Sequence, residues 1–550
     1  MSLKPQDMNP IPEETIRVAH TAFPKGNAIM RIRDSLGPIY TDAQFTALFP
    51  HDGQPALSPG RLALVSVLQF AEGLSDRQAA DAVRSRIEWK YTLALKLDDP
   101  GFDASVLSEF RSRLLAGGAE MQLFETLLIL LREQGFLKSR GKQRTDSTHV
   151  LAAVVTLNRL ECVGETLRHA LNVVATVAPD WLGAQAPVSW YERYARRFEE
   201  YRLPPKKEDR YALAEQIGTD GLQLLQLIDA EKVWAWLREI PAVQILRRVW
   251  IQQFSASEPG SPVHWRVAED LPPAPLLISS PYDPDARWSK KRETTWTGYK
   301  VHLTETCDDD LPHLITNVET TIATTGDQSM TDVIHTHLAE RDLLPGEHIV
   351  DTGYMTSDHL ISGQQQQIDL VGPLRADTSW QTRAAAGFGV ACFAIDWESQ
   401  QATCPVGKNS VIWKPMLDRQ GLNVINIRFA HSDCVDCPQR SHCVSSSRSR
   451  ALTIRERETY EAVEQARQRQ TTELFKKEYA KRAGIEGTLS QGVRLGDLRR
   501  TRSIGLPKTF HLHLLIATAL NFVRISAWLA EVPLAQTRIP PFVLLGKVAA

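Results

Sequence analysis

GYKVHLTETC (298–307) and HLITNVETTIATTG (313–326) are rich in β-branched residues and predict two neighbouring strands. Strands and helices alternate after them. We expect a helix over 330–341, a strand over 347–350 ending at Asp351, a helix over 357–366 and a strand over 369–373. This alternation predicts an α/β layer, in which helices cover a sheet.

The chain before this layer is expected to be helical over 41–140. Ser58-Pro59 is a strong helix start, with a capping residue followed by proline at the first helical position. The turn at 73–76 leads into a second short helix. Such a pair fits a helix-turn-helix that binds DNA, and it fits an ordinary all-helical domain equally well.

The overall charge and composition describe a globular chain with a local basic segment. Hydrophobic residues make up 43% and charged residues 23% of the 550 positions, which excludes a disordered, collagen-like or disulfide-dense protein. The net charge is -2, yet residues 440–530 carry 17 Lys and Arg against 8 Asp and Glu. The near-neutral average therefore conceals a basic segment around Glu486, where phosphate neutralisation is expected.

Targeting and membrane signals are not expected. The N-terminal stretch 1–17 has no apolar core, and the apolar stretch 511–530 is interrupted by His513, Asn521 and Arg524. The stretch is therefore expected to be a buried helix. Seven cysteines in a chain of this length do not suggest a disulfide framework, so we expect a reducing, cytoplasmic compartment.

Three acids stand where a metal site could form. Asp146 lies in the strand-like RTDSTHV (144–150), Asp351 ends a strand, and Glu486 follows a basic helix. Three such carboxylates could gather two Mg²⁺ ions, which would clamp the attacking and leaving oxygens of a phosphodiester. A cap or turn role is the alternative for each acid. Asp327 is either a turn residue or a neighbour of the second acid.

Together these pieces resemble the DDE transposases of bacterial insertion sequences, which have an RNase-H-like catalytic core. The resemblance covers roughly residues 20–530. It rests on LSDRQAADAVRSRIEWKYTLAL (74–95) and FDASVLSEFRSRL (102–114), then on RTDSTHV, GYKVHLTET and IVDTGYMTSDHL (349–360), and finally on EYAKRAGIEGTLSQGVR (478–494).

The resemblance implies roles for individual residues. Asp146 and Asp351 take the places of the first two catalytic acids, and Tyr479, Arg482 and Glu486 match a Tyr-x2-Arg-x3-Glu signature. Arg494 is expected to replace the signature's final Lys, whose position is Val493 here. On a continuous helix Tyr479, Arg482 and Glu486 share one face, so Tyr479 and Arg482 would hold a DNA phosphate. Gly484 and Gly487 favour a bend near the glutamate.

The activity implied is cleavage of DNA at terminal inverted repeats and strand transfer to target DNA. Two Mg²⁺ or Mn²⁺ ions would be bound by the three acids. The expected partners are DNA and further copies of the chain, as a dimer or larger assembly on DNA, with no membrane. The bacterial protein would associate with the nucleoid when bound to DNA. A hydrolytic nuclease of the same fold and a non-catalytic DNA-binding descendant are the alternatives.

A cysteine cluster precedes the third acid. Cys404, Cys434, Cys437 and Cys443 form Cys-x29-Cys-x2-Cys-x5-Cys, and the resemblance includes this cluster. We expect a structural Zn²⁺ with four ligands and no open position. His431 and His442 are alternative ligands, and reduced structural thiols are the alternative to a metal.

The complete prediction is an α/β protein with an RNase-H-like core, an all-helical N-terminal domain, a helical insertion and a Cys-rich insertion. Residues 452–484 are expected to form one long charged helix. The segments are 1–140 (helical, DNA binding or dimerisation), 141–156 (first core strand), 157–290 (helical insertion), 291–375 (core continuation), 376–450 (zinc-binding insertion) and 451–550 (C-terminal core helices).

Overall fold

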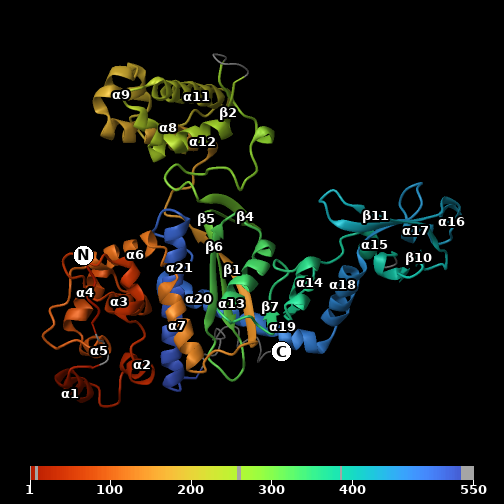
Figure 1. Ribbon diagram of the computed structural model, residues 1–550. Helices are drawn as coiled ribbons and strands as arrows, with labels where there is room; N and C mark the ends of the chain where they lie inside the picture. The colour runs from red at the N-terminus through yellow and green to blue at the C-terminus, as the bar shows by residue number, and fades with distance from the viewer. Residues whose placement is uncertain (1, 7–9, 257–261, 385–386, 534–550) are drawn as a thin grey trace, which may run out of the picture. The chain divides into compact units, whose positions relative to one another are not determined.

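The computed structural model (Figure 1) describes residues 2–6, 10–256, 262–384 and 387–533. The chain falls into two compact units. The first unit comprises Met1–Leu137, Ser147–Thr325 and Gly487–Ala550, and the second comprises Lys138–Asp146 and Gly326–Glu486. Strand β1 (Lys142–Leu151) crosses between the units after Asp146, and helix α20 (Gly484–Gly496) crosses after Glu486.

A six-stranded sheet contributes strands to both units. Its order is β4-β5-β1-β7-β8, with β6 also paired to β5. In the first unit, β5 pairs antiparallel with β4 and β6, whereas in the second unit β1, β7 and β8 are parallel. The expected mixed α/β layer is therefore confirmed. The strands are β4 (Arg287–Lys291), β5 (Thr294–Thr306), β6 (Ile315–Ile322), β7 (Glu347–Ile349) and β8 (Asp369–Val371).

The N-terminal part of the first unit is helical, as the capping signals predict. Ser58 accepts a hydrogen bond from Arg61 N at the start of α3, and Ser75 forms a capping box with Gln78 at the start of α4. The helices are α1 (Glu13–Ala22), α2 (Ala28–Leu36), α3 (Pro59–Glu72), α4 (Asp76–Ser85), α5 (Ile87–Thr92), α6 (Ser105–Ala116) and α7 (Gln122–Glu133).

Helix α21 (Leu506–Leu529) is the central helix of the first unit. It contacts α2, α3, α7 and β6 (Figure 1). By length and composition alone it could cross a membrane, but most of its apolar window is buried inside the protein. Its polar residues have partners there: Asn521 bonds the backbone of Ile315, and Arg524 pairs with the fully buried Glu305. These contacts are typical of a helix buried in the protein core, as the sequence predicts.

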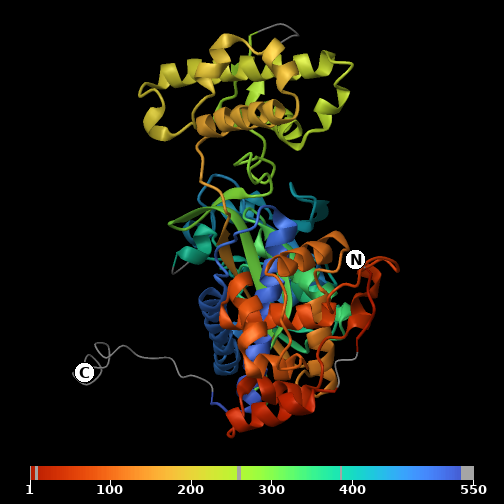
Figure 2. The same cartoon turned by 90° about the vertical axis from the view of Figure 1, so that its left-hand side faces the viewer.

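Helices α8–α12 enclose a hydrophobic core of their own within the first unit. The long helices α8, α11 and α12 lie side by side in Figure 2, where this segment is yellow, and their apolar faces bury side chains such as Leu167, Leu224 and Leu246. The helices are α8 (Arg159–Val177), α9 (Pro179–Gln185), α10 (Val188–Arg193), α11 (Lys207–Ala230) and α12 (Pro241–Gln253).

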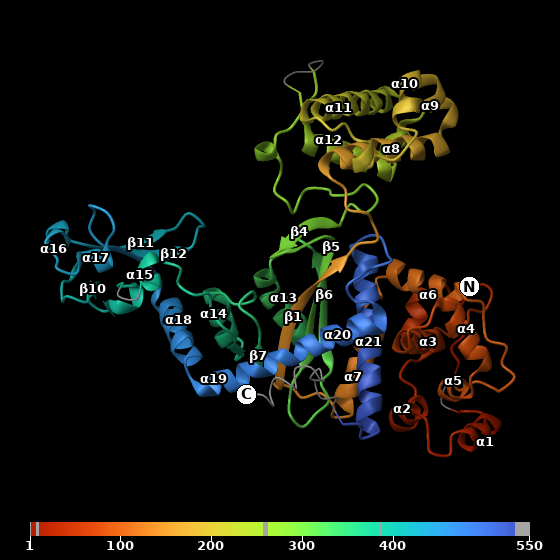
Figure 3. The same cartoon turned by 180° about the vertical axis from the view of Figure 1, so that it is seen from behind.

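The second unit contains a small antiparallel sheet that sequence patterning missed. Strand β13 (Ala451–Arg455) pairs with β12 (Asn423–Phe429), which pairs with β11 (Ser410–Leu417). The expected single helix over 452–484 is wrong, because Leu452 and Ile454 alternate into the core of this sheet. Helix α18 (Arg457–Gln470) begins after it, and Thr472 caps a separate helix, α19 (Glu473–Ala480), after a sharp turn (Figure 3).

Candidate functional site

Strand β1 directs three charged side chains to one side. Side chains alternate along a strand, so Lys142, Arg144 and Asp146 share a face. Lys142 Nζ lies 2.7 Å from Glu478 Oε2, and Arg144 Nη1 donates to the carbonyl oxygen of Lys481 at 2.6 Å. The face that carries Asp146 is therefore held against the end of α19 and the turn that follows.

Asp351 stands beside Asp146 at the carboxyl end of the neighbouring strand. The parallel register pairs Arg144 with Ile349. Asp146 lies two residues after Arg144, and Asp351 lies two residues after Ile349. The two acids thus occupy the same level of adjacent strands. The backbone N–H of Gly353 donates to Asp351 Oδ1 at 2.8 Å, which fixes the carboxylate at the strand end.

A further carboxylate borders the same turn. A Cβ on Gly353 would lie 2.9 Å from Asp351 Oδ1 and 3.3 Å from Asp327 Oδ2. Asp327 is also the first residue of the 3-10 turn η5 (Asp327–Met330). Asp327 is therefore both a turn residue and a neighbour of the second acid, Asp351.

The guanidinium of Arg482 brings the three predicted acids together. Its Nη2 lies 2.7 Å from Asp146 Oδ2 and 4.0 Å from Asp351 Oδ2, and its Nη1 lies 3.4 Å from Glu486 Oε1. The Arg482 and Asp146 side chains are 17% and 11% exposed, while Glu486 is 67% exposed. The cluster is thus a half-open site with two inner acids and one at the solvent edge.

The three carboxylates of this site raise the pKa values of both Arg482 and Tyr479. Burial opposes the charged form of Arg482, but Asp146, and to a lesser extent Tyr479, Asp351 and Glu486, raise the pKa of the guanidinium. Burial and the three carboxylates also raise the pKa of Tyr479, against the effect of Arg482. Tyr479 therefore stays a neutral hydrogen-bonding group at neutral pH.

The segment carrying the signature residues is not one continuous helix. Helix α19 ends at Ala480, a 3-10 turn η7 (Lys481–Ala483) follows, and α20 begins at Gly484. The bend thus lies at Arg482, before the glutamate. The expectation of one straight face for Tyr479, Arg482 and Glu486 is corrected in that respect, although Arg482 still meets Glu486.

Arg144 explains the position of this turn. It is 5% exposed, and a Cβ on Gly484 would lie only 2.1 Å from its Nη1. The guanidinium therefore lies directly on the glycine while it bonds the Lys481 carbonyl. Sequence reasoning missed this contact. Its only sequence signal is a basic residue two positions before Asp146, facing the same way.

The two remaining signature residues differ in their surroundings. Tyr479 stacks on Phe475, with ring centroids 5.6 Å apart and planes 7° apart, so its ring orientation is fixed. Arg494 belongs to the part of α20 in the first unit; its side chain is exposed and its Nε donates to the Ser490 carbonyl at 3.4 Å. Phosphate binding by either residue stays a prediction.

The opposite face of β1 is supported by a buried histidine pair. Thr145 Oγ1 lies 2.7 Å from His348 Nε2, and His348 Nδ1 lies 2.8 Å from His335 Nε2. Burial lowers the pKa of both rings, to about 4 for His335. The rings are therefore neutral at physiological pH and join β1, β7 and α13 (Thr331–Glu340).

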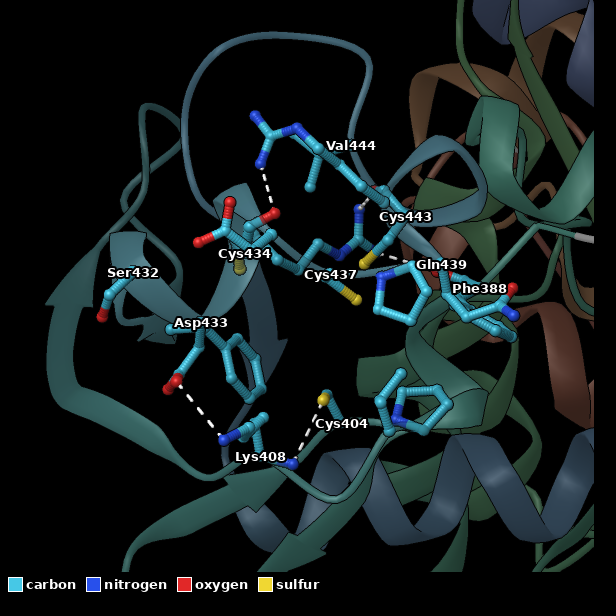
Figure 4. A pocket seen from close by; sticks show the side chains of 17 residues that line it. Phe388, Cys404, Lys408, Ser432, Asp433, Cys434, Cys437, Gln439, Cys443 and Val444 are labelled. Carbon is cyan, nitrogen blue, oxygen red and sulfur yellow. Dashed lines mark hydrogen bonds and ion pairs between the residues drawn. The ribbon is translucent and has the colours of Figure 1, made fainter.

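The predicted zinc ligands line one cavity of about 230 Å³ in the second unit (Figure 4). Cys404 follows strand β10 (Gln401–Thr403), Cys434 lies on α16 (His431–Val435), and Cys443 ends α17 (Arg440–Cys443), with Cys437 between these helices. Cys404 Sγ accepts a hydrogen bond from Lys408 N.

The two alternative ligands differ from these cysteines. Neither His431 nor His442 lines the cavity, and His442 packs against Phe388 with ring centroids 6.1 Å apart. Burial raises the pKa of the Cys443 thiol, and the other three cysteines raise it further against Arg450. Within the described ranges, no three His, Cys, Asp or Glu side chains stand close enough to hold one metal ion, at either cluster.

Two family models match the chain. One is described as Transposase DDE domain and matches residues 403–526; the other is described as Transposase domain (DUF772) and matches residues 18–113. The first match contains Arg482, Glu486 and the four cavity cysteines, and it leaves Asp146 and Asp351 outside. No curated protein and no solved structure matches the chain.

The contact between Arg144 and Gly484 predicts a stability effect. Gly484→Ala would push the buried guanidinium off the Lys481 carbonyl, and overpacking of this kind costs about 1–3 kcal/mol. Alanine on this helix also gains about 1 kcal/mol over glycine, so we expect the free energy of unfolding, measured by urea denaturation, to fall by up to about 2 kcal/mol.

Gly487→Ala is the matched control on the same helix. A Cβ there meets nothing within 4 Å, and alanine favours a helix over glycine by about 1 kcal/mol. This variant should be as stable as the parent or slightly more stable. Equal stability of the two variants would show that Arg144 does not hold the turn.

Proposed function

We propose that this chain, a DDE transposase of the insertion-sequence type, cuts DNA at the ends of its own element and joins those ends to target DNA. The observation that carries the proposal is the convergence of Asp146, Asp351 and Glu486 on one guanidinium. The transposase families imply a DNA substrate, and the DDE domain implies an RNase-H-like core for the α/β layer.

The donor chemistry of the cluster fits two divalent cations. Carboxylate oxygens are the ligands that Mg²⁺ and Mn²⁺ prefer, and a cationic group already stands among these three. Asp146, Asp351 and Glu486 would hold the ions. When bound, the ions would stabilise charge on the transferred phosphoryl group and activate the attacking water or 3′-hydroxyl.

Arg482 can pair either with the three acids or with a phosphate of bound DNA. Its guanidinium now neutralises the acids, and it must leave them before other cations can use the same oxygens. Once released, it can pair with a phosphate of the bound strand, since its planar fork suits carboxylate and phosphate alike. Tyr479 would donate a hydrogen bond to the same backbone, and Arg494 would bind a phosphate further along.

The remaining parts of the proposal concern DNA recognition and assembly. The helical domain over 1–140, with its α3–α4 turn, is proposed to bind the terminal inverted repeats or to pair copies of the chain. A dimer or larger assembly would hold two element ends together. In the cell the protein would be cytoplasmic and would associate with the nucleoid through DNA.

Substitution of the second acid, Asp351, tests the catalytic assignment. Asp351→Asn removes one negative charge but keeps the side-chain shape, so Mg²⁺-dependent cleavage of end DNA should fall by at least the about 10–100-fold that loss of an outer-shell partner of a metal ligand costs. With the parent protein, element-end DNA that carries a label at its 3′-hydroxyl should become joined to target DNA. Cleavage without joined product would indicate the hydrolytic nuclease instead.

Asp358→Asn is the control for this experiment. Asp358 is an exposed acid of the second unit that pairs with Arg455 on the surface, where such pairs contribute at most about 1 kcal/mol. It should cleave like the parent. Equal cleavage by the parent and Asp351→Asn would sink the catalytic assignment, and DNA binding without any cleavage would favour the non-catalytic descendant.

Substitution of Arg482 tests whether its guanidinium competes with divalent cations. Arg482→Met leaves three like charges without their counter-ion, so the free energy of unfolding without Mg²⁺ should fall by about 1–3 kcal/mol. Mg²⁺ should then raise the melting temperature of this variant more than that of the parent, which must first expel its arginine. The melting temperature of each protein is measured by calorimetry at a series of Mg²⁺ concentrations.

Arg457→Met supplies the comparison, because Arg457 pairs with Glu398 and Glu461 away from the cluster. Its response to Mg²⁺ should equal the parent's. If Arg482→Met also responds like the parent, the guanidinium does not occupy the cation position.

The cysteine cavity supports the proposal of a structural Zn²⁺. Four thiols on separate segments line one cavity, which matches the soft, tetrahedral ligand set of zinc. Cys404, Cys434, Cys437 and Cys443 would hold it. All four positions would be filled by protein, so this ion would stabilise the small sheet and take no part in the chemistry.

Metal content tests the zinc proposal directly. The purified protein should contain one zinc per chain by atomic emission, and Cys437→Ser should lose most of it. Cys392→Ser is the control, since Cys392 is exposed and lies outside the cavity lining. Zinc absent from the parent, or retained by Cys437→Ser, would favour reduced structural thiols.

A further inference from the structure

The carboxyl end of β1 lies between two basic segments of the first unit. On one side Ala152 N donates to Thr297 O of β5, which forms a hairpin with β4. On the other side Leu151 N donates to Arg499 O at 2.8 Å, and Thr501 N donates to Leu151 O at 2.9 Å. Figure 3 shows β4 and β5 next to the arrowhead of β1.

Each of the two segments, 290–292 in the hairpin and 499–502 after α20, exposes three cationic side chains. The hairpin turns at Arg292, whose φ of 57° places a non-glycine residue in the left-handed region at the tip. The other segment follows α20. The exposed cations are Lys290, Lys291 and Arg292 on the hairpin, and Arg499, Arg500 and Arg502 on the segment.

One histidine shows that the two segments share a single environment. His149 of β1 packs on Trp296, with ring centroids 5.6 Å apart. Burial lowers its pKa, and both Arg499 and Lys291 lower it further. Cations from both segments therefore act on the same ring.

Few acids lie in these two segments. Glu293 is the one acid between Lys290 and Thr297, and Asp497 is the one acid between Arg494 and Arg502. Among the residues that the structure describes, no ion pair joins Lys290, Arg292, Arg499, Arg500 or Arg502 to a carboxylate. Exposed cations on two segments that flank the same strand end suit a polyanionic partner.

We propose that these six residues form a binding surface for the phosphate backbone of duplex DNA, named here the β1-end surface. The proposal rests on the proposed function, because it places DNA along the strand that carries the first acid. Phosphates repeat at regular intervals along a DNA duplex. The two cationic segments on either side of β1 can therefore contact several phosphates at once. The contacts would position DNA without reading its sequence.

Salt dependence of DNA binding tests the surface. One variant carries Arg499→Gln, Arg500→Gln and Arg502→Gln, and another carries Lys290→Gln, Lys291→Gln and Arg292→Gln. Each lost phosphate contact lowers the slope of log affinity against log salt by about 1. We expect each triple variant to lower it by about 2–3 and to weaken binding at least about tenfold at low salt. The probe is a labelled random-sequence DNA duplex, in an Asp351→Asn background that cannot cut it.

A third triple variant controls for net charge. Arg196→Gln, Arg197→Gln and Lys206→Gln remove the same charge from exposed positions beside α10 and α11. An equal loss of slope in this variant would overturn the surface, as would unchanged slopes in the two test variants. A loss seen only with an RNA duplex of the same sequence would overturn DNA as the partner.

The outcome is separable from that of the proposed function. If the surface is wrong but the function is right, the test variants bind like the parent while Asp351→Asn alone abolishes cleavage. If the function is wrong but the surface is right, the slopes fall although Asp351→Asn leaves cleavage unchanged. Circular dichroism and thermal melting of each variant distinguish lost contacts from lost folding.

Discussion

Asp146, Asp351 and Glu486 surround one guanidinium, that of Arg482, which offsets the repulsion among their charges. Asp146 lies within hydrogen-bonding distance of it, while Asp351 and Glu486 lie at 4.0 and 3.4 Å from its terminal nitrogens. The turn at 481–483 places this cation where the acids come together. The fold must therefore position one short turn accurately against the end of two parallel strands, and several other contacts serve that need.

The supporting contacts are arranged along β1 in the order of its residues. Lys142 binds Glu347 and Glu478, which joins the two strands to α19. Arg144 then bonds the turn itself, and Thr145 points to the other face, where it meets His348. Both faces of the strand are thus occupied within four residues of Asp146. A strand so constrained can hold a carboxylate in place even when its counter-ion leaves.

Sequence reasoning reached the acids but not the geometry that joins them. An acid in or at the end of an apolar strand is costly and therefore unusual, but the resemblance to the transposase family is needed to select Asp146 and Asp351 from the other acids. The bend at Arg482 could not be predicted, because it depends on Arg144 lying on Gly484, and such a contact leaves no periodic pattern. The helix expected over 452–484 failed for a related reason. Charged residues flank Leu452 and Ile454, so their strand pairing is visible only once β12 is beside them.

Charge distribution links the site to the rest of the molecule. The basic excess near the end of the chain is not one surface, because Arg482 and Arg469 are already paired with acids of the second unit. Arg499, Arg500 and Arg502, by contrast, remain exposed in the first unit. The same local excess of cations therefore does two different things. Where carboxylates are close it neutralises them, and where they are few it leaves positive charge available to a phosphate backbone.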